Sequence, residues 1–361
     1  MMITLAEYES KKNALVSELQ AIRDGAEGSI GLDKSISNLF RHRSTEKTRK
    51  LNVRNFNHVI SIDRENLTAE VEAMTTYEDI VAETLKFGLI PTVVPELKTI
   101  TIGGVATGIG LESSSLKYGF VHETIEELEI LLGSGETVVC SRTQNADLFL
   151  GFPNSYGTLG YALKVKVRLV AAKKYVKVTH LCFSDVKKFF DALNTICAEP
   201  PDFVDGTLFS KTEMYITRGD FTDEAPFESD YSYLDIYHQS IRKKPVDYLS
   251  VLNYLWRWDT DWYWHSAKYL MNHRLVRKMV GKKNLRSSTY WKIRDWMSKT
   301  GFIWPAIGTI YPTESVIQDV EIPIERAVEF DEFLDTEIGI RPFWICPVKT
   351  FDRASKFPLI R

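Results

Sequence analysis

Residues 99–120 read TITIGGVATGIGLESSSLKYGF and contain five glycines and three consecutive serines with almost no charge. Glycine lets the main chain approach a ligand closely, and successive backbone N–H groups form a concave site for a pyrophosphate. Serine hydroxyls add hydrogen-bond donors and acceptors without bulk. Two interpretations are open: a backbone cradle around an anionic or planar cofactor, or a set of tight turns between two strands. The close succession of TIGG, GIG and SSS favours the cofactor.

The segment departs from two common nucleotide-binding motifs. A dinucleotide fingerprint of the G-x-G-x-x-G type needs a strand before it and a helix after it. Gly108 and Gly110 supply its first two glycines, but Ser113 stands at the third position, and SSSLKYG is a poor helix former. A P-loop ends in G-K-[ST], and the segment has no such ending.

Length, composition and net charge limit the classes of function that this chain can have. The 361 residues are enough for two domains of about 150 residues each. The net charge of −3 argues against bulk nucleic-acid binding, because no overall basic excess is present to neutralise phosphates. No apolar run reaches the ~18 residues that a transmembrane helix needs, and no signal peptide is evident. We expect no nucleic-acid partner and no transmembrane segment.

The cysteines indicate the compartment. They are far apart and lack the paired spacing of a zinc site; they are Cys140, Cys182, Cys197 and Cys346. Reduced thiols in the cytoplasm and no metal site are the better interpretation.

Periodicity predicts the elements that must position the segment. Helices are expected over residues 1–28 and 75–88, the second with a Thr75–Glu78 capping box and a stop at Gly88. Hairpins are expected over residues 58–73 and 125–141, a short helix with a loop over 146–160, and a strand over 161–172. A strand and a helix open a second region at Tyr175. The predicted fold class is α+β, with hairpins in place of repeated βαβ units.

Longer stretches resemble a known family. Six stretches are similar to the delta-24-sterol reductase branch of the flavoproteins with a vanillyl-alcohol-oxidase or PCMH-type FAD-binding domain. They are the glycine–serine segment with its flanks, ADLFLGFPNSYGTLGYALKVKVRLVAAKKYV, SNLFRHR, WRWDTDWYW, IQDVEIP and RPFWICPV. The chain looks most like the soluble bacterial members of this branch. The resemblance covers about residues 30–350. It implies an N-terminal helical segment (1–30), an FAD-binding domain (31–173) and an α+β cap or substrate domain (174–361).

The resemblance also implies which residues contact FAD. In this family the glycine–serine stretch wraps the cofactor, and loops before and after it complete the site. The implied residues are Ser37, Asn38, Leu39, Phe40, Pro95, Thr101, Ile102, Gly103, Gly104, Thr107, Gly108, Gly110, Glu112, Ser113, Ser114, Tyr118, Gly119, Thr158, Leu159 and Gly160. Relatives that attach flavin covalently use a histidine or cysteine in such a loop. Because neither occurs in residues 99–119, we expect non-covalent FAD, with His122 structural.

The activity that the resemblance implies is reduction of an isolated carbon–carbon double bond, with electrons passing from NADPH through FAD to a lipid. Flavin supplies the redox chemistry, and the protein supplies orientation and a proton. The candidate acids are Tyr311, Glu112 and Asp259. Sequence does not separate a sterol side chain from a methylene-bearing or unsaturated acyl chain, although an acyl lipid suits a soluble bacterial-type member better.

Two features of the second region bear on the substrate. Residues 256–264 hold four tryptophans, which suit either a packed helix or the apolar wall of a lipid pocket. Six basic residues fall within thirteen positions, which suits a solvated face or, less so, peripheral contact with an anionic membrane surface. These are Arg274, Arg277, Lys278, Lys282, Lys283 and Arg286.

Other functions stay open at this stage. One is an FAD-linked oxidase of an alcohol or sugar, against which the tryptophan-rich cap argues modestly. Another is a degenerate flavin-binding protein without turnover. Its motivation is that the sequence stops at FPLIR, whereas related proteins continue into a tail that returns to the flavin domain.

Overall fold

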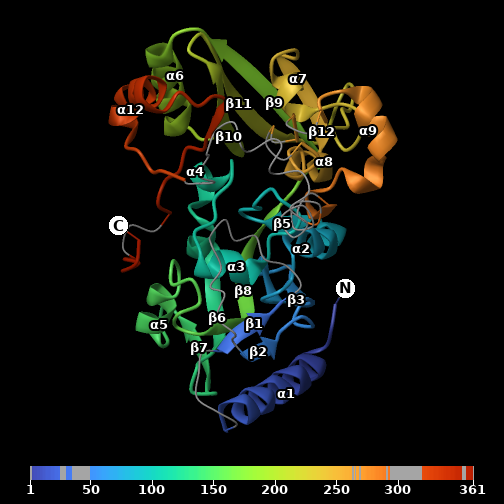
Figure 1. Ribbon diagram of the computed structural model, residues 1–361, viewed down its shortest axis with the longest axis vertical. Helices are drawn as coiled ribbons and strands as arrows, with labels where there is room; N and C mark the ends of the chain where they lie inside the picture. The colour runs from blue at the N-terminus through green and yellow to red at the C-terminus, as the bar shows by residue number, and fades with distance from the viewer. Residues whose placement is uncertain are drawn as a thin grey trace, which may run out of the picture.

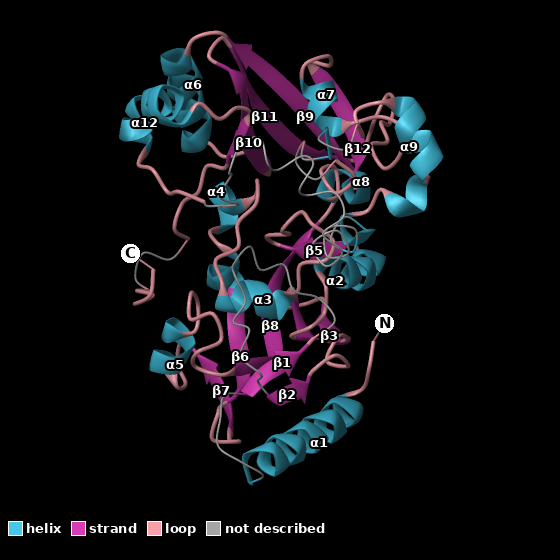
Figure 2. Ribbon diagram, in the orientation of Figure 1, coloured by secondary structure: helices cyan, strands magenta, loops and turns pink. Residues whose placement is uncertain are grey.

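The computed structural model describes residues 2–24, 30–34, 49–261, 264, 266–267, 270–289, 292, 319–351 and 355–360. Within them the chain forms two main sheets, one at each end of the molecule in Figure 1. Helices lie on or beside both sheets, so the predicted α+β class is confirmed (Figure 2).

The lower sheet has six strands, ordered β3-β4-β8-β6-β7 with β5 also paired to β8, and every pairing is antiparallel. Its strands are β3 (Val59–Asp63), β4 (Thr68–Glu72), β5 (Leu89–Pro91), β6 (Ile125–Leu131), β7 (Thr137–Ser141) and β8 (Tyr161–Ala171). The two predicted hairpins and the long strand are all present. The apolar residues of β8 alternate with lysines and an arginine, which places one side in the core.

Short elements surround this sheet. They are the parallel pair β1 (Ile30–Asp33) and β2 (Arg49–Asn52), the helices α2 (Tyr77–Thr84), α3 (Ile102–Thr107), α4 (Ser115–Tyr118) and α5 (Ala146–Gly151), and the 3₁₀ turns η1 (Leu85–Phe87) and η2 (Val121–Thr124). The predicted capping box was wrong by one residue. Thr76 caps α2 by accepting a hydrogen bond from the Asp79 backbone N–H, whereas the Thr75 hydroxyl donates to the carbonyl of His58. Gly88 ends the helical stretch with φ of 71°, as expected of a left-handed stop.

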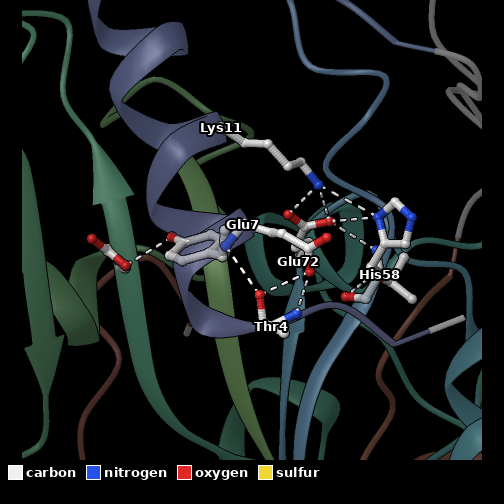
Figure 3. Close-up of polar contacts among 8 residues, drawn as sticks. Thr4, Glu7, Lys11, His58 and Glu72 are labelled. Atoms are coloured by element: carbon white, nitrogen blue, oxygen red, sulfur yellow. Dashed lines mark hydrogen bonds and ion pairs between the residues drawn. The ribbon is translucent and has the colours of Figure 1, made fainter.

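Helix α1 (Leu5–Asp24) is fixed to the lower sheet by buried polar contacts (Figure 3). Thr4 and Glu7 form a capping box at its start, since each backbone N–H is bound by the other side chain. Lys11 Nζ lies 2.7 Å from a Glu72 carboxylate oxygen, and the His58 ring nitrogen Nδ1 lies 3.0 Å from the same carboxylate. Glu72 is fully buried, so this cluster joins α1 to β4.

The upper sheet has five antiparallel strands, ordered β12-β9-β11-β10-β13. They are β9 (Tyr175–Phe183), β10 (Phe203–Ser210), β11 (Glu213–Thr222), β12 (Val246–Ser250) and β13 (Phe343–Ile345). Helices α6 (Val186–Ala198) and α12 (Ala327–Phe333) pack together beside it, and α7 (Tyr237–Ile241), α8 (Val251–Leu255) and α9 (Arg274–Val280) lie near β12 (Figure 1). The remaining turns are η4 (Lys282–Asn284), η5 (Ile324–Arg326) and η6 (Leu334–Ile338).

One hydrophobic core runs from the lower sheet into the upper one. Val71 and Val165 of the lower sheet belong to the same buried cluster as Val176 and Leu249 of the upper sheet, and Trp258 lies within it. The two sheets therefore share buried surface. The domain limits at residues 30 and 173 stay predictions.

Candidate functional site

The glycine–serine segment is more helical than its composition suggested. Residues 102–107 form α3, with Thr101 as the cap that accepts a hydrogen bond from the Gly104 backbone N–H. Residues 108–114 are irregular, and residues 115–118 form one turn, α4. Neither of the interpretations drawn from the sequence, a continuous cradle or simple turns, describes the segment fully.

Several of its glycines are required by contacts within the protein. A Cβ on Gly103 would lie 2.6 Å from the Cβ of Ala73; outside the segment, one on Gly160 would lie 2.7 Å from the carbonyl oxygen of Leu131. Such distances are shorter than real Cβ atoms adopt, so these positions permit only glycine. Gly119 has φ of 80°, and a Cβ there would collide with Glu123. By contrast, Gly104 is exposed.

The serines join the segment to the upper sheet. The backbone carbonyl of Ser113 accepts a hydrogen bond of 2.8 Å from the N–H of Val204 at the start of β10. The Ser113 hydroxyl lies 3.3 Å from the hydroxyl of Tyr254, and the Ser114 hydroxyl donates to the carbonyl of Thr92. The end of the segment is therefore held at the junction between the two sheets.

A buried charged cluster lies at this junction. Its centre is Arg257, which is 1% exposed and contacts three buried carboxyl groups. These are Glu96 at 3.3 Å, Glu112 at 3.2 Å and Asp205 at 3.0 Å. The ring of Tyr254 lies 4.2 Å from the guanidinium carbon. We call these four charged side chains the Arg257 cluster. Glu96 lies just before the glycine–serine segment and Glu112 lies within it, whereas Asp205 and Arg257 come from the cap region.

Burial changes the acidity of this cluster. It raises the pKa of Asp205 to about 6, although Arg257 acts in the opposite direction. Burial also raises the pKa of Glu96 well above its usual range. Perturbed carboxyl groups at the junction of two regions are typical of functional sites.

A small cavity adjoins the cluster. It measures about 10 Å³, which is room for about one water molecule, and Thr92, Glu112, Ser113, Tyr254 and Arg257 are among the residues that line it. The Thr92 hydroxyl is buried and makes no hydrogen bond to any described residue. An unpartnered hydroxyl beside Glu112 and Ser113 fits a polar group of a bound cofactor. The cavity has room for about one water molecule, so it can receive a single polar atom and no larger part of the cofactor that the resemblance implies.

The other residues predicted to contact FAD differ in their burial and in the elements that hold them. Pro95 is buried in the loop before α3, and Tyr118 is half-buried on α4. Thr158 and Leu159 are exposed. The Thr107 hydroxyl donates to the Gly103 and Gly104 carbonyls, so it is already used within α3. Ile102 is buried in the core, and Gly108 and Gly110 lie between α3 and α4. Ser37, Asn38, Leu39, Phe40 and Tyr311 lie outside the described residues.

The two described acid candidates have different surroundings. Glu112 belongs to the Arg257 cluster. Asp259 is instead held by the Ser287 hydroxyl at 2.5 Å and by the backbone N–H of Lys98 at 3.2 Å. These contacts fix a loop of the cap region, whereas Glu112 lies in the glycine–serine segment; a catalytic role for either stays a prediction.

The structure corrects part of what was predicted for the aromatic and basic stretches of the cap region. Residues 256–261 are turns and not a helix, and Trp258 is fully buried against Tyr237, inside the core. Arg277 is also fully buried and donates to the backbone carbonyl of Tyr233, so it is no part of a solvated face. Arg274, Lys282 and Arg286 pair with acidic side chains.

Sequence reasoning missed three members of the Arg257 cluster. Arg257 stands between two tryptophans, and Asp205 interrupts the apolar run FVDGTLF. A lone charged residue in an apolar stretch is rarely buried without a partner. The sequence could therefore have indicated that Arg257 and Asp205 have buried partners. Glu96 lies in the PEL stretch between the two prolines and the glycines and carries no comparable signal.

Comparison with known proteins adds independent evidence. Residues 35–141 match the model of an FAD binding domain family. The chain is 27% identical over 323 residues to the Delta(24)-sterol reductase of Homo sapiens, covering 84% of this chain and 60% of that protein. It is 27% identical over 333 residues to the enzyme of the same name from Arabidopsis thaliana, covering 83% and 56%. It is also 25% identical over 240 residues to Cytokinin dehydrogenase 1 of Arabidopsis thaliana, covering 61% and 41%.

The chain thus spans about 60% of the length of the curated sterol reductases that it matches. Among the described residues, no helix is long and apolar enough to cross a membrane, and no group of acidic, histidine or cysteine side chains is arranged to hold a metal ion. The resemblance drawn from the sequence is confirmed: residues 35–141 match an FAD binding domain family, and the chain is similar over most of its length to the Delta(24)-sterol reductases.

Proposed function

We propose that this protein is a flavin-dependent reductase that adds two electrons and two protons to a carbon–carbon double bond of a lipid, with NADPH as the electron donor. The observation that carries the proposal is the Arg257 cluster, which places buried acidic groups beside the predicted FAD segment. The similarity to Delta(24)-sterol reductases across most of the chain supports the same reaction class.

An isolated double bond needs both a reductant and a proton source. Bound FAD, held without a covalent bond, supplies the reducing chemistry. Glu112 would supply the proton, because it is the acidic side chain that lines the cavity between the segment and the cap region. Ser113 and Ser114 hold this part of the chain in place.

The substrate is proposed as a lipid with an unsaturated or methylene-bearing acyl chain, and a sterol side chain is the related alternative. A cytoplasmic location and peripheral contact with a membrane also stay proposals. They rest on four cysteines that form no disulfide and on the exposed basic residues of the cap region.

The first test is the visible absorbance spectrum of the purified protein, before and after denaturation. A flavin spectrum released into solution by denaturation supports non-covalent FAD. Anaerobic NADPH is then expected to bleach the bound flavin, and an unsaturated acyl lipid to restore its colour with formation of the saturated product.

The other outcomes contradict the proposal in different ways. Bleaching by an alcohol or sugar, with peroxide release in air, identifies an oxidase; similarity to a cytokinin dehydrogenase makes this the second candidate. Flavin that neither NADPH nor any lipid extract bleaches identifies a binding protein without turnover. A colourless protein that cannot be reconstituted with FAD removes the enzyme proposal for this chain.

A further inference from the structure

The outer face of α9 exposes large apolar side chains. Leu275 and Met279 stand four residues apart, so they lie on the same face of this helix, and they are 76% and 79% exposed. They are the most exposed large apolar side chains in the part of the chain that the structure describes. Leu270, in the turn before the helix, is 62% exposed. Single apolar side chains on a surface are ordinary, but three within ten positions indicate a surface that another body covers.

Lysines stand among these apolar side chains. Lys278 lies on the same face of α9, three residues after Leu275, and Lys282 and Lys283 follow in η4. All three lysines are exposed. Lys282 lies 3.7 Å from Asp230, whereas Lys278 and Lys283 form no ion pair with any described residue. The face is therefore both apolar and positively charged.

The sequence around α9 contains no acidic residue that could balance this charge. Residues 262–294 hold nine lysines and arginines and no aspartate or glutamate. The acidic partners that are present come from other elements, and they pair Arg274 with Asp235, Lys282 with Asp230 and Arg286 with Glu78. Because these pairs leave Lys278 and Lys283 unmatched, the region keeps a local positive excess in a chain whose net charge is −3.

The inner side of α9 is fixed to the rest of the cap region. Arg277 is fully buried and donates to the backbone carbonyl of Tyr233 and, at 3.0 Å, to the hydroxyl of Thr260. Leu285, which follows η4, is buried as well. Figure 1 shows α9 at the outer edge of the upper part of the molecule, beside α7 and α8. While Arg277 keeps these contacts, the apolar face of α9 stays turned outward.

We propose that residues 270–283 form a surface that binds an anionic lipid membrane. Leu270, Leu275 and Met279 enter the apolar layer, and the three exposed lysines contact the phosphates of the lipid headgroups. Exposed apolar side chains among lysines are typical of segments that lie on a membrane surface. Only the supply of lipid substrate from this membrane rests on the proposed function, and the binding itself does not.

Two other occupants suit these side chains less well. A second copy of this chain, docked through the same face, would bring the unpaired lysines of the two copies together, and such like-charge contacts are unfavourable. A nucleic acid would pair with the lysines but would give Leu275 and Met279 no apolar partner. An anionic membrane satisfies both kinds of side chain at once.

The first experiment measures co-sedimentation of the full chain with lipid vesicles. Vesicles of phosphatidylcholine alone are compared with vesicles that also contain the anionic lipid phosphatidylglycerol. We expect binding to the anionic vesicles that weakens as the salt concentration rises. Leu275→Glu and Met279→Glu should each weaken this binding by about 10-fold or more, because each removes a buried apolar side chain. Lys278→Gln should weaken it by about fivefold.

Ile340→Glu is the matched control. Ile340 is 64% exposed and follows η6, which contains Asp335 and Glu337, so its surroundings are acidic. It also stands apart from α9, since the neighbouring helix α12 lies on the opposite side of the upper sheet in Figure 1. This variant should bind the anionic vesicles as the parent does. Thermal unfolding curves of all variants check that the substitutions leave the fold unchanged.

A second measurement needs no variant. Anionic vesicles are expected to slow the amide hydrogen exchange of residues 270–283 in the unaltered protein, because the membrane shields this segment from water and restrains its opening. Exchange in helix α12 should stay the same with and without vesicles. Equal slowing at both places, or none at residues 270–283, would contradict the assignment of the surface.

The outcomes separate this surface from the other occupants and from the reductase function. No binding to anionic vesicles, or binding that Leu275→Glu and Met279→Glu leave unchanged, overturns the proposal. Binding that only Lys278→Gln weakens identifies an electrostatic contact without insertion and overturns it too. A dimer that Leu275→Glu dissociates, in a protein that binds no vesicle, assigns the face to a second copy. Vesicle binding through these residues by a protein that reduces no lipid supports the surface and overturns the reductase function.

Discussion

Two buried charged clusters of this protein differ in their charge balance. At α1, the Glu72 carboxylate is met by Lys11, by the His58 ring and by the backbone N–H of His58. At the junction of the sheets, one guanidinium serves three carboxyl groups. The first cluster offsets its charge with its own partners and needs nothing further. The second gathers three acidic side chains around one guanidinium beside the glycine–serine segment, whereas the first holds α1 to the lower sheet.

The largest effect is expected from removing the single cation of the second cluster. Arg257→Met removes the guanidinium that contacts three buried carboxyl groups and should lower the free energy of unfolding by about 3–5 kcal/mol at pH 7. Urea unfolding at pH 7 and at pH 5 measures it. The loss should be smaller at pH 5, where more of these carboxyl groups are protonated. An equal loss at both pH values would contradict the comparison.

The pH dependence of stability tests the second cluster from the acidic side. The pKa of Asp205 is raised from 3.8 to about 6 in the folded protein, so folding favours its protonated form. Its contribution is fully present below about pH 4 and is lost as the pH rises through about 6, a change of roughly 2–3 kcal/mol. Asp205→Asn should remove this part of the pH dependence in thermal unfolding curves. A profile identical to the parent's would show that the pKa of Asp205 does not change on folding, and would contradict this prediction.

The first cluster should respond less strongly. Lys11→Met removes one of the two side chains that bind Glu72, and the free energy of unfolding should fall by about 1–3 kcal/mol. Because His58 and the backbone still bind the carboxylate, the loss should stay below that of Arg257→Met under the same conditions. A larger loss than that of Arg257→Met would reverse the ranking of the two clusters.

The smallest effect is expected at a second buried polar contact of α1, between Tyr8 and Glu129. The Tyr8 hydroxyl donates to Glu129 at 2.7 Å, and Lys12 binds the same carboxylate at 2.7 Å. Tyr8→Phe removes one hydrogen bond and leaves the ion pair, so a loss of about 1 kcal/mol is expected in chemical unfolding. Lys12→Met should cost more than Tyr8→Phe, and the opposite order would show that the ion pair contributes little.

The sequence predicted local elements well because their signals are local. Alternation along β8 marks a half-buried strand, and a positive φ at Gly88 ends the helical stretch where a glycine was expected. The conformation of the glycine–serine segment was harder to predict, since Gly103 is required by its contact with Ala73, thirty residues earlier. Composition shows that glycine is needed, but it does not show which neighbour requires it.

The candidate site was predicted only in part. Glu112 was identified because it lies in a recognisable segment. Its partners come from positions 96, 205 and 257, which only the packing of the two sheets brings together. No spacing rule joins residues so far apart in the chain. The grouping of these four charged side chains is therefore visible in three dimensions and not in the sequence.

Amide hydrogen exchange can report on the hydrogen bond from the Val204 amide to the Ser113 carbonyl. This amide proton exchanges with solvent only when the glycine–serine segment separates from the first residue pairs of β10. Its exchange rate therefore reports how often the two regions part, residue by residue, without any label or substrate. Flavin that stabilises the segment should slow exchange at this amide more than at amides in the middle of β11, where the ladder is closed on both sides.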